Sequence, residues 1–311
     1  MNNFKYSNTN KRYYTFDYYY KKKYSQKMVK VPINLGLSCP NIDGTKSVGG
    51  CSFCNSKGSG DFAGDKEDSL LKQWNQGKEN LSLKWTDVNY LAYCQSRSNT
   101  YGDIEYLKEC YSFFNNLEEC KEISLGTRPD CINEEIISYL ASLDKPVTIE
   151  LGFQTMHVRT IEKINRAYSN QEFEDAIQLL NKYNIDIVVH IINGLYDETK
   201  EEMVDTLKYV STFNIQGIKI HLLHIMSDSG LLKEYNDNKF ELLTKETYID
   251  IVVEQLRHLR EDIVVQRLTG DAPTNTFIGP TWSRKKSIVI NDIDKCMAEN
   301  DYYQGDLYEK S

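Results

Sequence analysis

Short apolar runs alternate with longer amphipathic stretches along most of this chain. The apolar runs suit buried parallel strands, and the stretches between them place apolar residues at helical spacing, as Phe173, Ile177 and Leu180 do. Strands are expected at residues 30–37, 88–94, 122–125, 147–153, 185–192 and 218–223, and helices at 68–77, 104–117, 133–143, 171–183 and 198–213. Repeated strand–helix units predict an α/β fold, a partial (β/α)6 barrel that resembles a TIM barrel.

The two ends of the chain depart from this alternation. Residues 1–30 are a basic, tyrosine-rich N-terminal arm, residues 31–270 are the expected barrel, and residues 271–311 are a C-terminal extension packed on it. Further elements are expected as a helix at 244–259, a strand at 263–268 and a helix at 284–299. There is no run of about 18 apolar residues and no charged-then-apolar leader, so we expect a cytoplasmic protein without a membrane partner.

Three cysteines, Cys39, Cys51 and Cys54, lie in a glycine-rich loop directly after the first expected strand. Clustered thiolates favour zinc or iron–sulfur sites, and both normally take four ligands. The first histidine is His157, so no imidazole lies nearby in the sequence. Three thiolates on a 4Fe–4S cubane leave one iron free to bind a small molecule. The alternative is a zinc site completed by a distant cysteine, for which the candidates are Cys94, Cys110, Cys120 and Cys131.

The residues around these cysteines resemble the radical S-adenosylmethionine superfamily. The pattern is Cys-x11-Cys-x2-Cys, with Pro40-Asn41, Asp43-Gly44, Gly49-Gly50 and Phe53 at the positions that carry the likeness. The first gap is longer than in the commonest pattern of the superfamily, Cys-x3-Cys-x2-Cys. This longer gap is similar to that of a bacterial subgroup related to the radical domain of the Elongator catalytic subunit. The resemblance continues through residues 126–130, 150–155, 194–199 and 267–271.

The resemblance implies a 4Fe–4S cluster on the three cysteines and S-adenosylmethionine on the open iron. It places Phe53 against the adenine, Gln95 and Ser96 near the methionine amine, Glu150 and Gln154 near the ribose or amino group, and Arg166 on the carboxylate. Glu150 is also notable by itself, because a carboxylate inside an apolar strand needs a partner. The alternatives are a salt bridge from Glu150 to a neighbouring strand, and a polar loop around Gln95 that only caps the barrel.

Histidines and an arginine near the expected strand ends are weaker candidates for contact with substrate. His190, His221 and His224 lie in or beside the fifth and sixth expected strands and could donate protons in the cavity, although strand histidines are often satisfied core residues. Arg128 follows the third expected strand, and its alternative role is an ion pair with Asp130.

The N-terminal arm has an unusual composition. Residues 1–30 contain eight Lys or Arg, one Asp and seven Tyr, a net charge of +7, whereas the whole chain carries −8. Basic side chains interleaved with aromatic rings are typical of single-stranded nucleic-acid binding. The alternative is an extended segment that wraps the barrel, with packed tyrosines and solvated lysines.

The subgroup resemblance implies an enzyme that acts on tRNA. The expected reaction converts the carboxymethylaminomethyl side chain at carbon 5 of the wobble uridine to aminomethyl, with an external electron donor of flavodoxin or ferredoxin type. Two other hypotheses are a radical enzyme for a small metabolite and a non-catalytic, zinc-stabilised RNA-binding protein.

Overall fold

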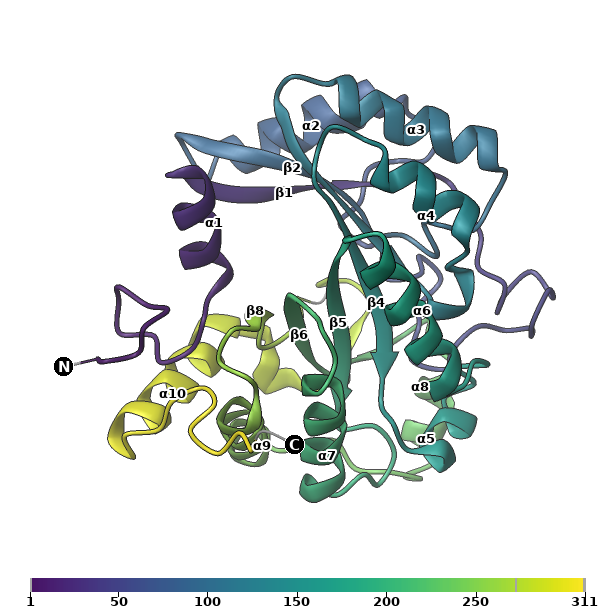
Figure 1. The fold of residues 1–311 in the computed structure, drawn as a ribbon. Helices are drawn as coiled ribbons and strands as arrows, with labels where there is room; N and C mark the ends of the chain where they lie inside the picture. Colours follow the sequence, from purple (N-terminus) through teal and green to yellow (C-terminus); the bar gives the residue numbers. More distant parts are fainter. Residues whose placement is uncertain (1, 272, 310–311) are drawn as a thin grey trace.

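Seven parallel strands form one curled sheet, and this confirms the predicted partial barrel (Figure 1). The computed structural model describes residues 2–271 and 273–309. The strands follow in chain order: β1 (Lys27–Ile33), β2 (Val88–Cys94), β3 (Cys120–Thr127), β4 (Val147–Gln154), β5 (Asp186–Asn193), β6 (Gly217–Leu222) and β8 (Val264–Arg267). The strand expected at 263–268 pairs with β6, so the sheet has one strand more than the six predicted repeats.

Helices connect most consecutive strands and cover the outer face of the sheet (Figure 1). They are α2 (Leu70–Ser82), α3 (Ile104–Asn116), α4 (Glu134–Ala141), α6 (Asn170–Lys182), α7 (Lys200–Ser211) and α9 (Lys245–His258). Each begins after a Ser, Thr, Asp or Asn whose side chain accepts a backbone hydrogen bond from the first turn. The local sequence therefore sets where these helices start, and α4 begins after Asn133, at the start of the helix predicted at 133–143.

The main core lies between the sheet and these helices. Phe173, Ile177 and Leu180 form the buried stripe of α6 that the sequence predicts. The ring of Phe173 packs on Phe153 of β4, with 4.2 Å between centroids. Since side chains alternate across a strand, the same strands also point residues into the barrel interior.

Several short elements were not predicted. The helix α1 (Phe16–Tyr24) forms within the arm, and α5 (Val158–Lys163) and α8 (Leu231–Asn236) have only six residues each. A two-residue strand, β7 (Ile225–Met226), pairs antiparallel with β9 (Phe277–Gly279). The 3₁₀ turns η1 (Pro129–Cys131) and η2 (Thr281–Arg284) were not predicted either. Such short segments carry too few residues to show a period. The last helix, α10 (Lys286–Glu299), agrees with the helix predicted at 284–299.

The N-terminal arm bridges the gap between the first and last strands of the open barrel. The Val265 N–H of β8 donates to the Tyr14 carbonyl at 2.7 Å, and α1 packs against both β1 and β8. The hydroxyls of Tyr20 and Tyr24 donate to the Glu122 carboxylate of β3 at 2.8 and 2.6 Å. These contacts correspond to the packed alternative for the arm, with part of it helical rather than extended.

The cations of the arm are largely neutralised by this packing. Ion pairs join Lys5 to Glu261, Lys11 to Asp294, Arg12 to Asp301, Lys21 and Lys27 to Asp17, Lys23 to Glu122 and Lys30 to Glu150. Lys22 is exposed and has no ion pair among the described residues. The basic arm therefore serves as the counter-charge of an acidic barrel.

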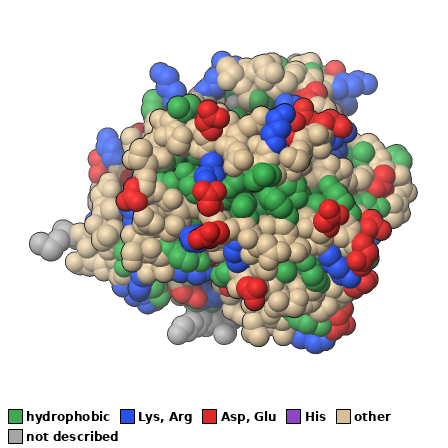
Figure 2. All heavy atoms as spheres, turned by 90° about the horizontal axis from the view of Figure 1, so that it is seen from above, with side chains coloured by type: hydrophobic (Ala, Val, Ile, Leu, Met, Phe, Trp, Pro, Cys, Tyr) green, Lys and Arg blue, Asp and Glu red, His purple; other side chains and the backbone are tan. Residues whose placement is uncertain are grey.

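On the face seen from above in Figure 1, neither basic nor acidic side chains form a large patch of one charge. Figure 2 shows basic and acidic side chains interspersed there, around a band of hydrophobic side chains. Among the described residues, no helix has both the length and the apolar character that crossing a bilayer requires.

Candidate active site

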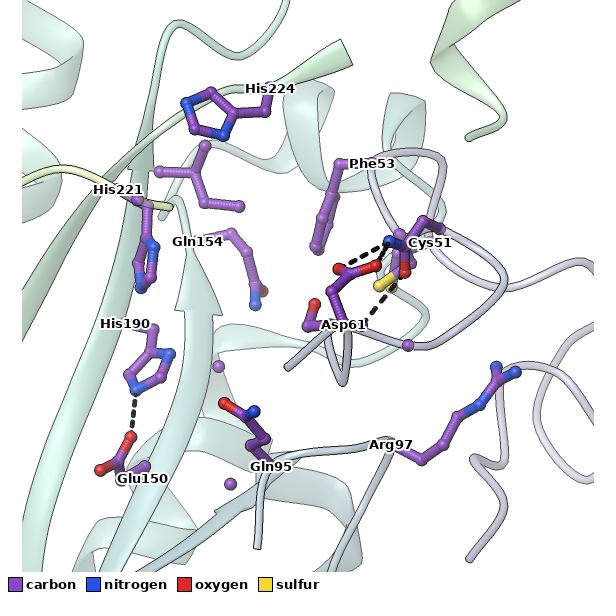
Figure 3. Close-up of a pocket in the computed structure, with 18 of the residues that line it drawn as sticks. Cys51, Phe53, Asp61, Gln95, Arg97, Glu150, Gln154, His190, His221 and His224 are labelled. Atoms are coloured by element: carbon purple, nitrogen blue, oxygen red, sulfur yellow. Dashed lines mark hydrogen bonds and ion pairs between the residues drawn. The ribbon is translucent and has the colours of Figure 1, made fainter. Parts of the chain in front are cut away.

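A cavity of about 310 Å³ opens at the carboxyl ends of the strands, where parallel barrels place their functional groups. Cys51 and Phe53 lie on one side of it, on the loop after β1 (Figure 3). His190 and His221 lie on the opposite side, on β5 and β6 (Figure 3). The cavity therefore places the thiols of one loop opposite the imidazoles of two strands.

The cysteine loop turns back on itself at two consecutive glycines. Gly49 and Gly50 have φ values of +83° and +76°, which residues with a side chain rarely adopt. A Cβ on Gly50 would also lie 3.2 Å from the Ile42 side chain. Asn41 is completely buried beneath the turn, where its Nδ2 donates to the Asn165 carbonyl at 2.6 Å. The glycines that the resemblance singled out thus shape the approach to Cys51.

The electrostatic surroundings of the cysteines are not equivalent. A hydrogen bond from Cys54 lowers the pKa of Cys51 to about 7, assisted by the Arg128 charge and the Asn41 amide and opposed by burial. The Asn41 Nδ2 lies 3.4 Å from the Cys51 sulfur, and the Arg128 Nη1 lies 4.0 Å from it. The bond to Cys51, together with burial, raises the pKa of Cys54 well above its usual value. Cys51 is therefore more readily ionised than Cys54.

The donor set fits an iron–sulfur cluster better than a zinc ion. Cys39, Cys51 and Cys54 all line the cavity, whereas the four cysteines considered as a fourth zinc ligand do not, and all four are buried. In residues 2–271 and 273–309, no three His, Cys, Asp or Glu side chains surround the position of a single metal ion. A cubane does not need such a point, because each thiolate binds a different corner.

Of the six residues expected near S-adenosylmethionine, three line the cavity and form no ion pair. They are Phe53, Gln95 and Gln154. Gln154 ends β4 with φ +65°, and its Oε1 accepts the Tyr168 hydroxyl at 2.8 Å. Ser96 is buried off the cavity lining, and its hydroxyl donates to the Lys57 carbonyl at 3.1 Å. Ser96 therefore fixes the neighbouring loop.

Glu150 lies at the wall of the cavity, and its carboxylate is fully engaged by protein groups. Oε1 receives Lys30 at 2.5 Å and the Ser124 hydroxyl at 2.7 Å, while Oε2 receives Lys219 and, at 2.8 Å, His190. Burial opposes its ionisation, but the Lys219 and Lys30 charges hold the pKa of Glu150 well below its ordinary value. These are the interior ion pairs that the sequence allowed as the alternative to a cofactor contact.

Arg166 is completely buried and does not line the cavity. Its guanidinium donates to the carbonyls of Phe153 at 2.6 Å, Thr155 at 2.7 Å and Tyr168 at 3.1 Å. It also donates to the Asn170 side chain at 2.8 Å. In this arrangement Arg166 ties the end of β4 to the loop before α6, so it positions Gln154 and does not present a free fork to a ligand.

The three histidines line the histidine side of the cavity, which we define by His190, His221, His224, Arg267 and Gly270. The His190 and His221 rings are 5.2 Å apart between centroids. Burial lowers the pKa of His190 to about 4, with Lys219 adding to the effect, and burial also lowers the pKa of His224 to about 4. These imidazoles are therefore neutral near pH 7.

Arg128 lies at the end of β3 and faces the cysteine loop. Its Nε and Nη2 bind the Asp130 carboxylate at 2.9 and 2.8 Å, the ion pair that the sequence allowed. Since its Nη1 is near the Cys51 sulfur, the pair holds a fixed positive charge beside the thiol. This favours a role toward the metal site over a role toward substrate.

Sequence reasoning missed several residues of the site. Lys219 lies in the apolar run of β6 and is 3% exposed, so it carries the same signal that identified Glu150. Tyr93 lines the cavity and accepts a hydrogen bond from Lys219 at 3.1 Å. No sequence signal distinguishes Tyr93 from the many other tyrosines of the chain.

Comparisons with known proteins support the same kind of site. The family model described as the radical SAM superfamily matches residues 45–210, and the model described as the radical SAM C-terminal domain matches residues 215–299. The uncharacterized protein YtqA of Bacillus subtilis (strain 168) is 40% identical over 311 residues, covering 99% of this chain and 97% of that protein.

Two similarities extend to proteins with more informative names. A tRNA uridine(34) acetyltransferase of Methanocaldococcus jannaschii is 22% identical over 217 residues, which cover 62% of this chain and 40% of that protein. The structure of Elp3 from Methanocaldococcus infernus, with residues 1–46 deleted, superposes with a TM-score of 0.68 at 16% identity, covering 89% of this chain and 64% of that one. At 16% identity, this superposition shows that the two folds are similar.

Proposed function

The chain belongs to the radical S-adenosylmethionine superfamily, whose enzymes use a 4Fe–4S cluster and S-adenosylmethionine, and from this premise we propose that it modifies tRNA. The proposed reaction of this cytoplasmic enzyme converts carboxymethylaminomethyl to aminomethyl at carbon 5 of the wobble uridine. The observation that carries the proposal is the shared cavity, in which three loop thiols face a polar wall of histidines and an arginine.

The residues of the cavity divide the work. Cys39, Cys51 and Cys54 would hold the cluster, and Arg128 and Asn41 would stabilise negative charge on Cys51. Phe53, with Gln95 and Gln154, would contact the cofactor. Ser96, Glu150 and Arg166 would serve by holding these elements in place, since their polar atoms are bonded within the protein.

When bound, the reduced cluster and S-adenosylmethionine supply a 5′-deoxyadenosyl radical that removes one hydrogen atom from a C–H bond. In the proposed substrate this bond belongs to the methylene between nitrogen and carboxylate. The resulting carbon radical loses one electron, to an oxidised acceptor of flavodoxin or ferredoxin type, and its nitrogen releases one proton to water, which leaves an imine. Water then adds to the imine carbon, and the C–N bond breaks to leave the aminomethyl uridine and glyoxylate. The barrel must position the methylene and admit water only afterwards.

The choice of tRNA rests on likeness and on surface character. The tRNA uridine(34) acetyltransferase is 22% identical over 62% of this chain, and the Elp3 structure shares its fold. The net charge of −8 and the mixed surface predict that binding depends on a few local contacts. A binding constant that falls with salt, with a log–log slope of about −0.7 per phosphate contact, would support an RNA ligand. A flat response would count against it.

The decisive experiment is anaerobic reconstitution, with dithionite in place of the flavodoxin- or ferredoxin-type donor. Three to four irons per chain, 5′-deoxyadenosine release and conversion of tRNA from a strain that retains the carboxymethylaminomethyl group would support the proposal. Cys54→Ser is the control that should lose the cluster. Cofactor cleavage with unchanged tRNA nucleosides would reject the tRNA substrate and favour a small metabolite. A colourless zinc protein would reject the enzyme altogether.

A further inference from the structure

The histidine side of the cavity contains a cation, Arg267, that shares its nearest carboxylate with a second cation. Arg267 ends β8 and has a side chain that is 32% exposed. Its nearest carboxylate, Asp271, lies 3.7 Å away and already binds Lys286 at 2.9 Å. The Arg267 guanidinium forms no hydrogen bond with any of the residues that the structure describes. A half-buried guanidinium with five unused N–H donors favours an anionic ligand.

The other carboxylate on this wall cannot provide the missing anion. Glu150 is held by Lys30 and Lys219, two lysines against one acid. With Arg267, Asp271 and Lys286 included, this region has four cationic groups and two carboxylates, apart from the imidazoles. Burial lowers the pKa of Lys219 well below its ordinary value, and even when Lys219 is counted as neutral the region keeps one positive charge more than its carboxylates. This surplus makes the histidine side favourable for an incoming carboxylate.

A second polar group on the same side lacks a partner. The Nε2 of His221 is buried and forms no hydrogen bond with a described residue. A neutral imidazole carries one N–H, so His221 can donate to an oxygen that enters the cavity. Leaving a buried polar atom unbonded is unfavourable, which suggests that a ligand completes it.

The space beside these groups is kept open by a glycine. A Cβ on Gly270 would lie 3.4 Å from the His224 ring and 3.8 Å from the Nδ1 of His221. Gly270 lines the cavity and does not have a left-handed backbone conformation. Its missing side chain therefore leaves room for a small group next to both imidazoles.

We propose that the histidine side is a carboxylate-binding subsite, in which Arg267 binds the carboxylate oxygens and His221 donates a further hydrogen bond. Its ligand is the terminal carboxylate of the substrate side chain, so this inference rests on the proposed function and assigns the part of the site that recognises the substrate. Anchoring the carboxylate here turns the adjacent methylene toward the cysteine loop across the cavity. The aminomethyl product lacks this anchor and is released.

The test compares two free nucleosides, 5-carboxymethylaminomethyluridine and 5-aminomethyluridine, by calorimetry on the anaerobic holoenzyme. Wild type should prefer the carboxylated nucleoside by about tenfold to a hundredfold, the range for a hydrogen bond to a charged group. Arg267→Met should abolish the preference, and Arg267→Lys should keep part of it. An absent preference in wild type, or an equal preference in Arg267→Met, would overturn the subsite.

S-adenosylmethionine also carries a carboxylate, so its affinity is measured in the same variants. A loss of cofactor affinity in Arg267→Met with an unchanged nucleoside preference would assign the subsite to the cofactor and overturn our assignment. Arg284→Met is the matched control, because this nearby arginine does not line the cavity. Gly270→Ala is a second test that leaves every charge in place. Its added methyl group should weaken binding of the carboxylated nucleoside more than binding of the aminomethyl nucleoside.

Failure of the subsite and failure of the proposed function give different results. If Arg267 controls the nucleoside preference but wild type leaves tRNA unchanged, the subsite stands and the tRNA reaction falls. If wild type converts tRNA and Arg267→Met does so with the same KM, the reaction stands and the subsite falls.

Discussion

The side-chain amide of Asn41 donates to the sulfur of Cys51 across 3.4 Å, so one cysteine of the loop differs from the other two. No side-chain N–H of a described residue reaches Cys39 or Cys54 in the same way. Hydrogen bonds to a thiolate stabilise the more negative, reduced form of an iron–sulfur centre.

Replacing Asn41 should therefore make the cluster harder to reduce. Loss of one N–H···S bond in Asn41→Leu should lower the reduction potential by about 20–60 mV, the one-electron equivalent of a typical hydrogen bond. Redox titration followed by electron paramagnetic resonance measures this shift. Asn34→Ala is the control, because Asn34 lies in the same loop and forms no hydrogen bond with a cysteine sulfur. An unchanged potential in Asn41→Leu would contradict the role assigned to Asn41.

Glu150→Gln should destabilise the fold strongly. It removes the carboxylate that neutralises the buried Lys219 and the partly exposed Lys30, and breaking a buried ion pair by removing one partner costs about 3–5 kcal/mol. Urea unfolding of the anaerobic protein measures the change. Glu134→Gln, which breaks an exposed ion pair with Lys182, should leave the midpoint unchanged. Adding Lys219→Met to Glu150→Gln should recover part of the loss, and no recovery would argue against charge burial as the cause.

The packing of the N-terminal arm predicts a stability effect from a single hydroxyl. Tyr20→Phe keeps the buried ring but loses the bond to the Glu122 carboxylate, with an expected cost of about 1.5–3 kcal/mol. The hydroxyl of Tyr18 bonds no described residue, so Tyr18→Phe is the matched control. Equal thermal midpoints for the two variants would mean that the arm does not hold the barrel closed.

The cavity histidines predict how stability depends on pH. The pKa values of His190 and His224 are lowered to about 4 from an ordinary 6.5, so the unfolded chain binds more protons between these values. The free energy of unfolding should then decrease as pH falls from about 6.5 toward 4. The depressed pKa of Glu150 acts separately, because its contribution is lost only as pH falls below the ordinary glutamate value of 4.5. His224→Gln, which removes one of the two lowered pKa values, should flatten the decline, and an unchanged decline would contradict the role of His224.

Arg166→Lys distinguishes a structural from a cofactor-binding role. Lysine cannot reproduce a fork that serves three carbonyls and an amide, so we expect a lower melting temperature. If Arg166 only positions Gln154, the affinity for S-adenosylmethionine measured well below the melting temperature should change little. A loss of affinity without a loss of stability would restore the predicted contact with the cofactor carboxylate.

The regular part of the fold was predictable because its signals are local. Alternating apolar runs located six of the barrel strands, and the seventh was predicted as a strand at 263–268 but not as part of the repeat. Cap residues such as Asn133 mark the helix starts. The cysteine spacing identified the metal loop without any structure. In contrast, Glu150 was recognised as needing a partner, but the identity of that partner depends on which strands face each other across the barrel. Likewise, only the structure shows that Arg267 has a single carboxylate nearby among the described residues, Asp271, and that it shares Asp271 with Lys286.

The bond between Tyr14 and Val265 has a consequence for biosynthesis. The arm is synthesised well before the strand edge that it covers. Until β8 is made, Tyr14 lacks both its backbone partner and the apolar contact with Val264, so closure of the barrel by the arm is a late step of folding.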